Sequence, residues 1–188
     1  MEHIRKQLEE ICPLTDNDWQ SFYAKLKRHE FSKGSLILRE GEKENYLSFI
    51  DRGMIRFYIT RIDNDLTFGF SFEGEFTSGY DSFLTRTDSY YAIEALTDTT
   101  LWRLTYDDLQ IIYNTTGMGN AIGRVFSERL FLLKSKRELS LLSDTAEQRY
   151  LKLFKERPNL VQYIPLKYIC SYIGITPQAL SRIRKRIS

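Results

Sequence analysis

Side chains that could read DNA are spaced along one predicted helix near the end of the sequence. A helix is expected from Pro177 to about Ile187, and Gln178, Ser181 and Arg182 lie largely on its polar side. Glutamine can form a paired contact with adenine, and arginine can form one with guanine, in the major groove. The spacing therefore indicates a helix that can read base edges.

A second short helix must position the first. It is expected from about Pro165 to Ile173 and ends at Gly174, because glycine tolerates the left-handed conformation of a helix end. Thr176 before a first-turn proline is a typical helix start. Two short helices joined by a tight turn predict a helix-turn-helix. The alternative is an amphipathic hairpin whose basic face is merely solvated.

This segment resembles the helix-turn-helix of the Crp/Fnr family of bacterial transcription regulators, in the short-tailed form common in Bacteroidetes. The matching positions are Ile164-Pro165, Lys167-Tyr168-Ile169, Ser171-Tyr172, Gly174-Ile175-Thr176-Pro177 and Leu180-Ser181-Arg182-Ile183-Arg184-Lys185. The resemblance implies that Gln178, Ser181 and Arg182 contact bases, although glutamate is frequent in the family where Gln178 stands. The expected phosphate contacts are Thr176, Lys167, Arg184, Lys185 and Arg186.

Charge is distributed unevenly along the 188 residues. Residues 1–116 carry 13 Lys and Arg against 20 Asp and Glu, whereas residues 145–188 carry 9 against 2. An acidic body with a basic end fits a regulator that meets phosphates only with that end. Two distant cysteines, the lack of a secretory pattern and the lack of a long apolar run favour the cytoplasm, with no membrane contact.

Between Phe31 and Leu104 the hydrophobic period is close to two, which is typical of strands. The expected strands are Ser35–Leu38, Tyr46–Ile50, Met54–Arg61, Leu66–Phe72, Tyr91–Leu96 and Leu101–Leu104. Helices precede this stretch, over Met1 to about Arg28, and follow it. The fold class predicted is therefore α+β, with an antiparallel β jelly roll. Lys33-Gly34, Gly41-Glu42 and Gly53 resemble the turns of the cyclic-nucleotide-binding-like sensor domain of the same family.

Residues 74–96 align with the phosphate-binding cassette of such sensors. Cyclic-AMP binders carry Gly-Glu-Leu and Arg-Ser-Ala there, and this chain has Ser78-Gly79-Tyr80 and Ser89-Tyr90-Tyr91 instead. Both charged groups are missing, so we expect no cyclic AMP binding in the usual mode. A pocket for another effector would involve Phe70, Tyr80, Arg86, Ser89, Tyr90 and Tyr91. The alternative is that the aromatic residues simply fill the barrel.

A long helix is expected from Ala121 to about Leu142, and the family resemblance makes it the dimerisation helix. Its predicted dimer face comprises Ile122, Val125, Phe126, Leu130 and Leu133. The helix could instead pack only on its own barrel. The predicted domains are a sensor over residues 1–116, a dimerisation helix over 117–143 and a helix-turn-helix domain over 144–188.

The sequence thus predicts a homodimeric regulator that binds an inverted repeat in double-stranded DNA. RNA polymerase and an unidentified small effector are open candidates as further partners. No catalytic residue, metal ligand or cofactor is expected, since His3 and His29 stand alone and an iron–sulfur cluster needs more thiolates. The rivals are a metal-binding or enzymatic cupin, an interaction module with a degenerate DNA-binding end, and a DNA-binding protein without an effector.

Overall fold

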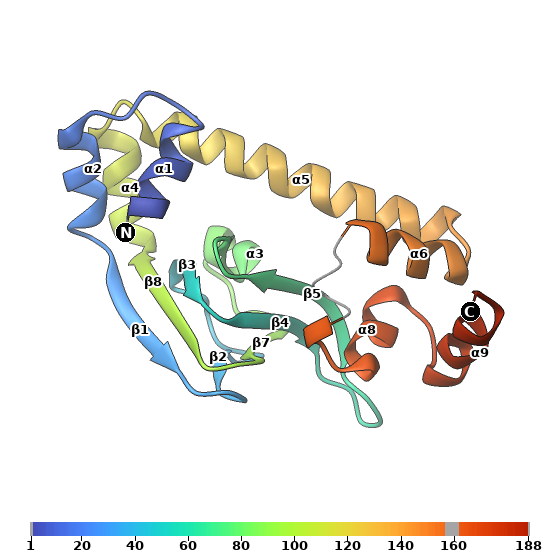
Figure 1. Ribbon diagram of the computed structural model, residues 1–188. Coiled ribbons are helices and arrows are strands. Elements are labelled where there is room, and N and C mark those ends of the chain that lie inside the picture. Colours follow the sequence, from blue (N-terminus) through green and yellow to red (C-terminus); the bar gives the residue numbers. More distant parts are fainter. Residues whose placement is uncertain (1, 157–161, 188) are drawn as a thin grey trace. The chain divides into compact units, whose positions relative to one another are not determined.

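A computed structural model of the chain describes residues 2–156 and 162–187 (Figure 1). The chain divides into two compact units. The first comprises Met1–Phe57 and Phe70–Arg129, and the second comprises Tyr58–Gly69 and Leu130–Ser188. This division differs from the expected limits after residues 116 and 143. The boundary after Arg129 falls within the long helix Gly119–Ser143, and the hairpin segment Tyr58–Gly69 belongs to the second unit.

The strands form two four-stranded sheets, which confirms the predicted α+β class with an antiparallel jelly roll. One sheet has the order β1 (Lys27–Phe31), β8 (Thr99–Thr105), β3 (Tyr46–Arg52) and β6 (Phe76–Thr77). The other has the order β2 (Leu36–Leu38), β7 (Ala92–Ala95), β4 (Met54–Ile59) and β5 (Leu66–Phe72). Most neighbours in these sheets are distant in sequence, so the fold depends on long-range pairing.

Strands β3 and β8 pair along most of their lengths, from Tyr46 opposite Thr105 to Arg52 opposite Thr100. The chain turns from β3 into β4 at Gly53, whose φ is 109°. A Cβ atom at this position would lie 2.8 Å from a Cα atom of β8. Only glycine combines a positive φ with the absence of a Cβ atom, so Gly53 allows the turn between β3 and β4 to approach β8 closely.

Helices α1 (Glu2–Glu9), α2 (Asp16–Tyr23) and α4 (Tyr106–Thr115) pack with β3 and β8 around one apolar core. Trp19 and Phe22 of α2 are buried in this core. A capping box between Thr15 and Asp18 begins α2.

The remaining helices follow one another along the chain (Figure 1). They are α5 (Gly119–Ser143), α6 (Ala146–Glu156), α8 (Leu166–Ile173) and α9 (Pro177–Ile187). The predicted helices over 121–142, 165–173 and 177–187 are confirmed to within two residues at each end. Over residues 2–156 and 162–187, no helix has both the length and the apolar content needed to cross a membrane.

Three elements were not predicted. Strand β1 begins at Lys27, where a helix was expected to continue to Arg28. The strand was missed because its sequence, Lys-Arg-His-Glu-Phe, alternates little in hydrophobicity, as an edge strand can. Strand β6 has two residues, and α3 (Tyr80–Thr85) has six. Both are too short for periodicity to identify.

Candidate functional site

The turn between α8 and α9 is held by backbone geometry and one hydroxyl group. Gly174 ends α8 in the left-handed conformation, with a φ of 73°. The Ile175 N–H donates to the Cys170 carbonyl at 2.9 Å, which closes the helix end. The Ala179 N–H donates to the Thr176 hydroxyl at 3.2 Å, so Thr176 caps the start of α9 as predicted.

Helix α9 has one buried face and one exposed face. Leu180 and Ile183 are buried, with 2% and 6% of their surfaces exposed. Gln178, Ser181 and Arg182 are exposed. The structure therefore brings together the three residues predicted to contact bases and leaves them accessible within the second unit.

The predicted phosphate-binding cations are also exposed: Lys167, Arg184, Lys185 and Arg186. The Lys167 ammonium lies 4.9 Å from the centre of the neighbouring Tyr168 ring. Arg186 forms an ion pair with Glu147 of α6. Arg186 can therefore bind a phosphate only by sharing or leaving that carboxylate.

Helix α5 places the predicted dimer residues differently from the expectation. Ile122 is buried in the core of its own chain, and Phe126 packs against that core. Ile122 and Phe126 are four residues apart, so they lie on one face of α5, and that face packs on the core of the same chain. Val125 and Leu130 are half-buried, and Leu133 is exposed.

A different apolar stripe of α5 faces solvent. It comprises Phe131, Leu132, Leu139 and Leu142, with exposed fractions of 70%, 65%, 62% and 79%. At 100° per residue, Phe131 and Leu142 lie on the side of the helix opposite to Ile122 and Phe126, and Leu132 and Leu139 lie on the adjoining side. Four large apolar side chains on one helix face are more than a solvated helix needs.

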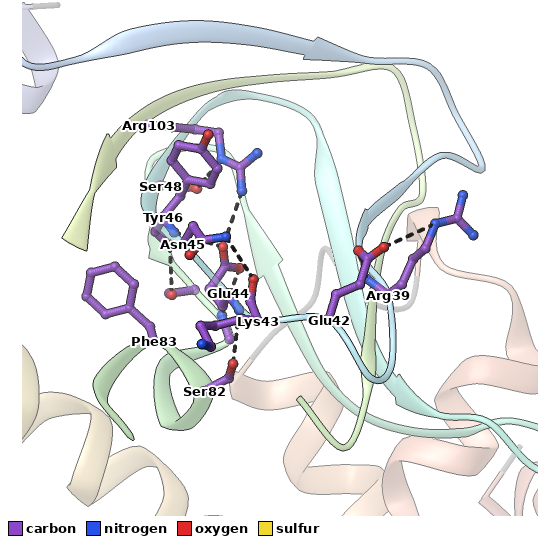
Figure 2. A network of polar contacts seen from close by, with 12 residues as sticks. Arg39, Glu42, Lys43, Glu44, Asn45, Tyr46, Ser48, Ser82, Phe83 and Arg103 are labelled. Atoms are coloured by element: carbon purple, nitrogen blue, oxygen red, sulfur yellow. Dashed lines mark hydrogen bonds and ion pairs between the residues drawn. The ribbon is translucent and has the colours of Figure 1, made fainter. Parts of the chain in front are cut away.

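In the first unit, the cassette helix α3 is held by a carboxylate from the loop before β3. Gly79 precedes α3, at the position where cyclic-AMP binders carry glutamate. Its N–H donates to the Glu44 carboxylate at 3.3 Å. The Glu44 N–H donates to the Ser82 hydroxyl at 2.9 Å (Figure 2). A Cβ at Gly79 would lie 2.7 Å from the Leu38 side chain and 3.3 Å from that of Glu44. A larger residue at position 79 would therefore require these side chains to move.

Glu44 forms a buried ion pair with Arg103 of β8. The Arg103 Nη2 atom lies 3.3 Å from the Glu44 Oε1 atom, and 7% and 3% of the two side chains are exposed. The guanidinium also lies 3.9 Å from the centre of the Tyr46 ring. Burial raises the pKa of the Glu44 carboxyl, and the charge of Arg103 and the N–H groups of Tyr46 and Gly79 oppose this shift.

Arg86, the one basic residue expected near an effector, is used by the protein itself. It ends α3 in the left-handed conformation, with a φ of 59°. Its guanidinium donates to the Glu44 carbonyl at 2.9 Å and to the Asn45 side chain at 2.7 Å, and lies 4.6 Å from the centre of the Tyr106 ring. These contacts fasten the end of α3 to the loop before β3.

The remaining candidate pocket residues do not form one lining. Ser89 is buried, and its hydroxyl donates to the Tyr91 carbonyl at 2.8 Å. The Tyr91 hydroxyl donates to Asp81 of α3, and burial, together with this carboxylate, raises the pKa of Tyr91. Tyr90 has 82% of its surface exposed. The half-buried Tyr80 ring stacks with that of Phe83, at 6.2 Å between ring centres.

A second buried arginine lies in the other sheet. The Arg56 Nε atom of β4 is 2.5 Å from the Glu94 Oε2 atom of β7, and 5% and 18% of these side chains are exposed. Phe70, also predicted for the pocket, is half-buried on β5 of the same sheet. Arg56 and Arg103 are thus each paired with a carboxylate of the chain and are not left for an anionic ligand.

Sequence reasoning missed the Glu44–Arg103 and Arg56–Glu94 pairs. A usable signal was present for one of them, since Arg103 follows Leu101 at the two-residue spacing of an inward strand face. An arginine at such a position needs a buried partner, but the sequence does not say which carboxylate provides it. Within the described ranges, no three His, Cys, Asp or Glu side chains are grouped closely enough to hold a metal ion.

Comparison with known proteins finds one family model that is similar to part of the chain. The model of the cyclic nucleotide-binding domain family matches residues 28–116, which span the strands, α3 and α4. No curated protein sequence matches the chain.

Solved structures share the fold along most of the chain. A transcriptional regulator of the Crp/Fnr family from Eubacterium rectale has a TM-score of 0.72 at 16% identity, covering 94% of this chain and 87% of that one. FixK2 from Bradyrhizobium japonicum has a TM-score of 0.71 at 17% identity, covering 86% and 84%. The c-di-GMP responsive regulator CLP of Xanthomonas campestris has a TM-score of 0.68 at 17% identity, covering 92% and 91%. The fold is therefore that of Crp/Fnr-type regulators.

Proposed function

We propose that the chain is a transcription regulator of the Crp/Fnr type that binds an inverted repeat in double-stranded DNA as a homodimer. The observation that carries this proposal is the exposed face of α9, on which Gln178, Ser181 and Arg182 lie together. These side chains have the chemistry to form paired hydrogen bonds with base edges in the major groove. The fold shared with Crp/Fnr-type regulators supports the same assignment.

The second copy of the chain packs against α5. Leu132 and Leu139 are seven residues apart, and Phe131 and Leu142 lie beside them on the same exposed face. This spacing suits pairing with a second helix around a two-fold axis. The axis then presents two α9 helices to DNA, at half-sites about 34 Å apart.

Dimerisation raises the affinity for a specific DNA site, because one α9 helix alone makes few base contacts. Cations at the DNA-facing end add affinity that does not depend on sequence and falls as salt rises. Lys167, Arg184 and Lys185 are exposed and are the proposed phosphate contacts. Arg186 contributes less, since Glu147 competes with phosphate for its guanidinium.

The sensor does not bind cyclic AMP in the usual mode. The Glu44 carboxylate already accepts the Gly79 N–H, and a Cβ atom at position 79 would lie 2.7 Å from the Leu38 side chain, which would have to move. At the position of the family's arginine stands Ser89, whose hydroxyl is bonded to the backbone of Tyr91. A cyclic phosphate would therefore enter without the cation that its burial requires.

Two other functions are weaker. A protein-interaction module with a degenerate DNA-binding end predicts basic residues scattered around α9, whereas the apolar and polar residues of α9 lie on separate faces. A regulator without any effector keeps the same DNA site and differs only in its response to ligands. Titration of the purified protein with metabolites, monitored by calorimetric melting, distinguishes this last case.

The direct test is selection of bound sites from random duplex DNA by the purified, ligand-free chain. A variant with alanine at Gln178, Ser181 and Arg182 is the matched control, because it keeps the fold and the flanking cations. The proposal predicts a two-fold inverted repeat for the wild-type chain and no enrichment for the control. Failure of the wild-type chain to enrich any sequence, even in cell extract, would contradict it. Added cyclic AMP should leave the recovered site unchanged.

A further inference from the structure

The hairpin between β4 and β5 belongs to the same compact unit as α8 and α9, although about 100 residues separate them in sequence. Ser171 of α8 makes the direct connection. Its hydroxyl accepts the Thr67 N–H at 2.8 Å and donates to the Asp65 carbonyl at 3.2 Å. One side chain thus bonds two backbone groups at the β5 end of the hairpin, where Thr67 is fully buried.

Arg137 of α5 makes a second connection to the same hairpin. Its Nε–H donates to the Phe68 carbonyl at 2.9 Å, and its guanidinium lies 4.5 Å from the centre of the Tyr172 ring. Tyr172 follows Ser171 in α8. Helix α5, the hairpin and α8 therefore meet at adjacent residues, and each is bonded to the next.

Helix α8 is fastened at its end as well. The Arg149 guanidinium of α6 donates to the Ile173 carbonyl at 2.7 Å and to the Asp144 carbonyl at 2.6 Å. It therefore joins the last turn of α8 to the residue that follows α5. Helix α9 is linked to α8 by a turn of three residues, so the direction of α9 relative to α5 depends on these contacts.

We propose that Ser171 is a positioning residue that fixes the spacing of the two DNA half-sites by bonding α8 to the β4–β5 hairpin. This inference rests on the proposed function, because it assumes a dimer that pairs through α5. In such a dimer, the angle between α5 and α9 sets the separation of the two α9 helices. Since Ser171 does not face the DNA-reading side of α9, its loss changes the spacing preference and leaves the half-site sequence unchanged.

The test uses the full-length chain and duplexes that contain the selected half-site twice, with spacers that differ by single base pairs. Ser171→Ala removes both hairpin bonds, whereas Ser171→Thr keeps the hydroxyl. Ser143→Ala is the matched control, since it removes a serine hydroxyl at the end of α5 that donates to the Leu139 carbonyl of its own helix.

We expect the wild-type chain, Ser171→Thr and Ser143→Ala to prefer one spacer length. In Ser171→Ala, the ratio of the affinities for that spacer and for one a single base pair longer or shorter should fall about fivefold to tenfold. This is the effect expected for the loss of about one or two hydrogen bonds. Base preference within the half-site should be the same for all four proteins. A general loss of folding would weaken every duplex alike and would not be rescued by threonine.

Equal spacer discrimination in Ser171→Ala and wild type would overturn the inference while leaving the proposed function intact. Absence of an inverted repeat with the wild-type chain would refute the proposed function itself. Hydrogen exchange gives a readout that needs no DNA. The Thr67 amide should exchange about tenfold faster in Ser171→Ala than in Ser143→Ala. Equal exchange in the two variants would show that the hairpin bond does not hold α8.

Discussion

Replacing Arg103 with methionine should destabilise the first unit strongly, because it leaves the buried Glu44 carboxylate without its cation. The two charged atoms are 3.3 Å apart, and 7% and 3% of the side chains are exposed. At an effective dielectric constant of about 20, this distance gives an attraction of about 5 kcal/mol. Removal of one partner of a buried pair typically costs about 3–5 kcal/mol, so both routes give the same range.

For a chain of this length, each kcal/mol shifts the melting temperature by about 2–4 °C, so Arg103→Met should melt roughly 6–20 °C lower. The loss should also depend on pH. Burial raises the pKa of Glu44, and without Arg103 less opposes that shift. A carboxyl whose pKa is raised in the folded state favours folding at low pH and loses that contribution as pH rises. The variant should therefore be less destabilised at pH 5 than at pH 8.

Arg28→Met is the matched control. The Arg28 Nη2 atom lies 2.6 Å from the Glu30 Oε1 atom, and 49% of the Arg28 side chain is exposed. Exposed pairs contribute at most about 1 kcal/mol, so this variant should melt close to wild type. Replacing Glu44 with glutamine in the Arg103→Met background should recover part of the stability, because no buried charge then remains unpaired. A loss of stability in Arg103→Met no larger than that in Arg28→Met, or additive effects of the changes at 44 and 103, would contradict this prediction.

Three further predictions concern DNA, assembly and acid stability. Arg182→Ala should weaken binding to the preferred site by about 1–3 kcal/mol and relax the preference at one base position. Lys185→Ala should weaken binding to all duplexes alike and reduce the slope of log affinity against log salt by about one, as measured by fluorescence anisotropy. Equal loss on every sequence for Arg182→Ala would refute its role as a base reader. Leu139→Glu should dissociate the dimer in sedimentation velocity, because it places a charge in an apolar interface; an unchanged dimer would place the interface elsewhere. The hydrogen bond from Lys25 lowers the pKa of Asp108, so this carboxylate stabilises the fold at neutral pH, and that contribution begins to be lost as the pH falls below about 4 toward the lowered pKa. Asp108→Asn should therefore be less stable than wild type at pH 7, and the difference should shrink at pH 3 in urea denaturation; a constant difference would contradict this.

The sequence predicted elements well where local chemistry determines them. Strand β5 and helix α9 have the expected bounds, and α8 and α9 are separated by the expected glycine and threonine. Glycine and proline restrict the backbone wherever they occur, and an amphipathic helix shows its period in one stretch of residues. These signals need no knowledge of the rest of the chain.

The sequence failed where a partner is distant or where the pattern is ambiguous. Arg103 and Glu44 are 59 residues apart, and nothing local indicates their pairing. The hydrogen bond between the Thr67 N–H and the Ser171 hydroxyl joins residues 104 apart, and it forms only through the packing of the second unit. Helix α5 is apolar on more than one side, so its period alone could not tell the face that covers the sensor from the exposed stripe containing Leu132 and Leu139.

Sedimentation of the 22.3 kDa chain with a duplex that carries its selected inverted repeat shows how many chains bind one site. We expect a complex of two chains on one duplex, formed without cyclic AMP and unchanged by its addition. A duplex with a single half-site should bind far more weakly at the same salt concentration. One chain per inverted repeat, or a complex that forms only when cyclic AMP is present, would contradict the account.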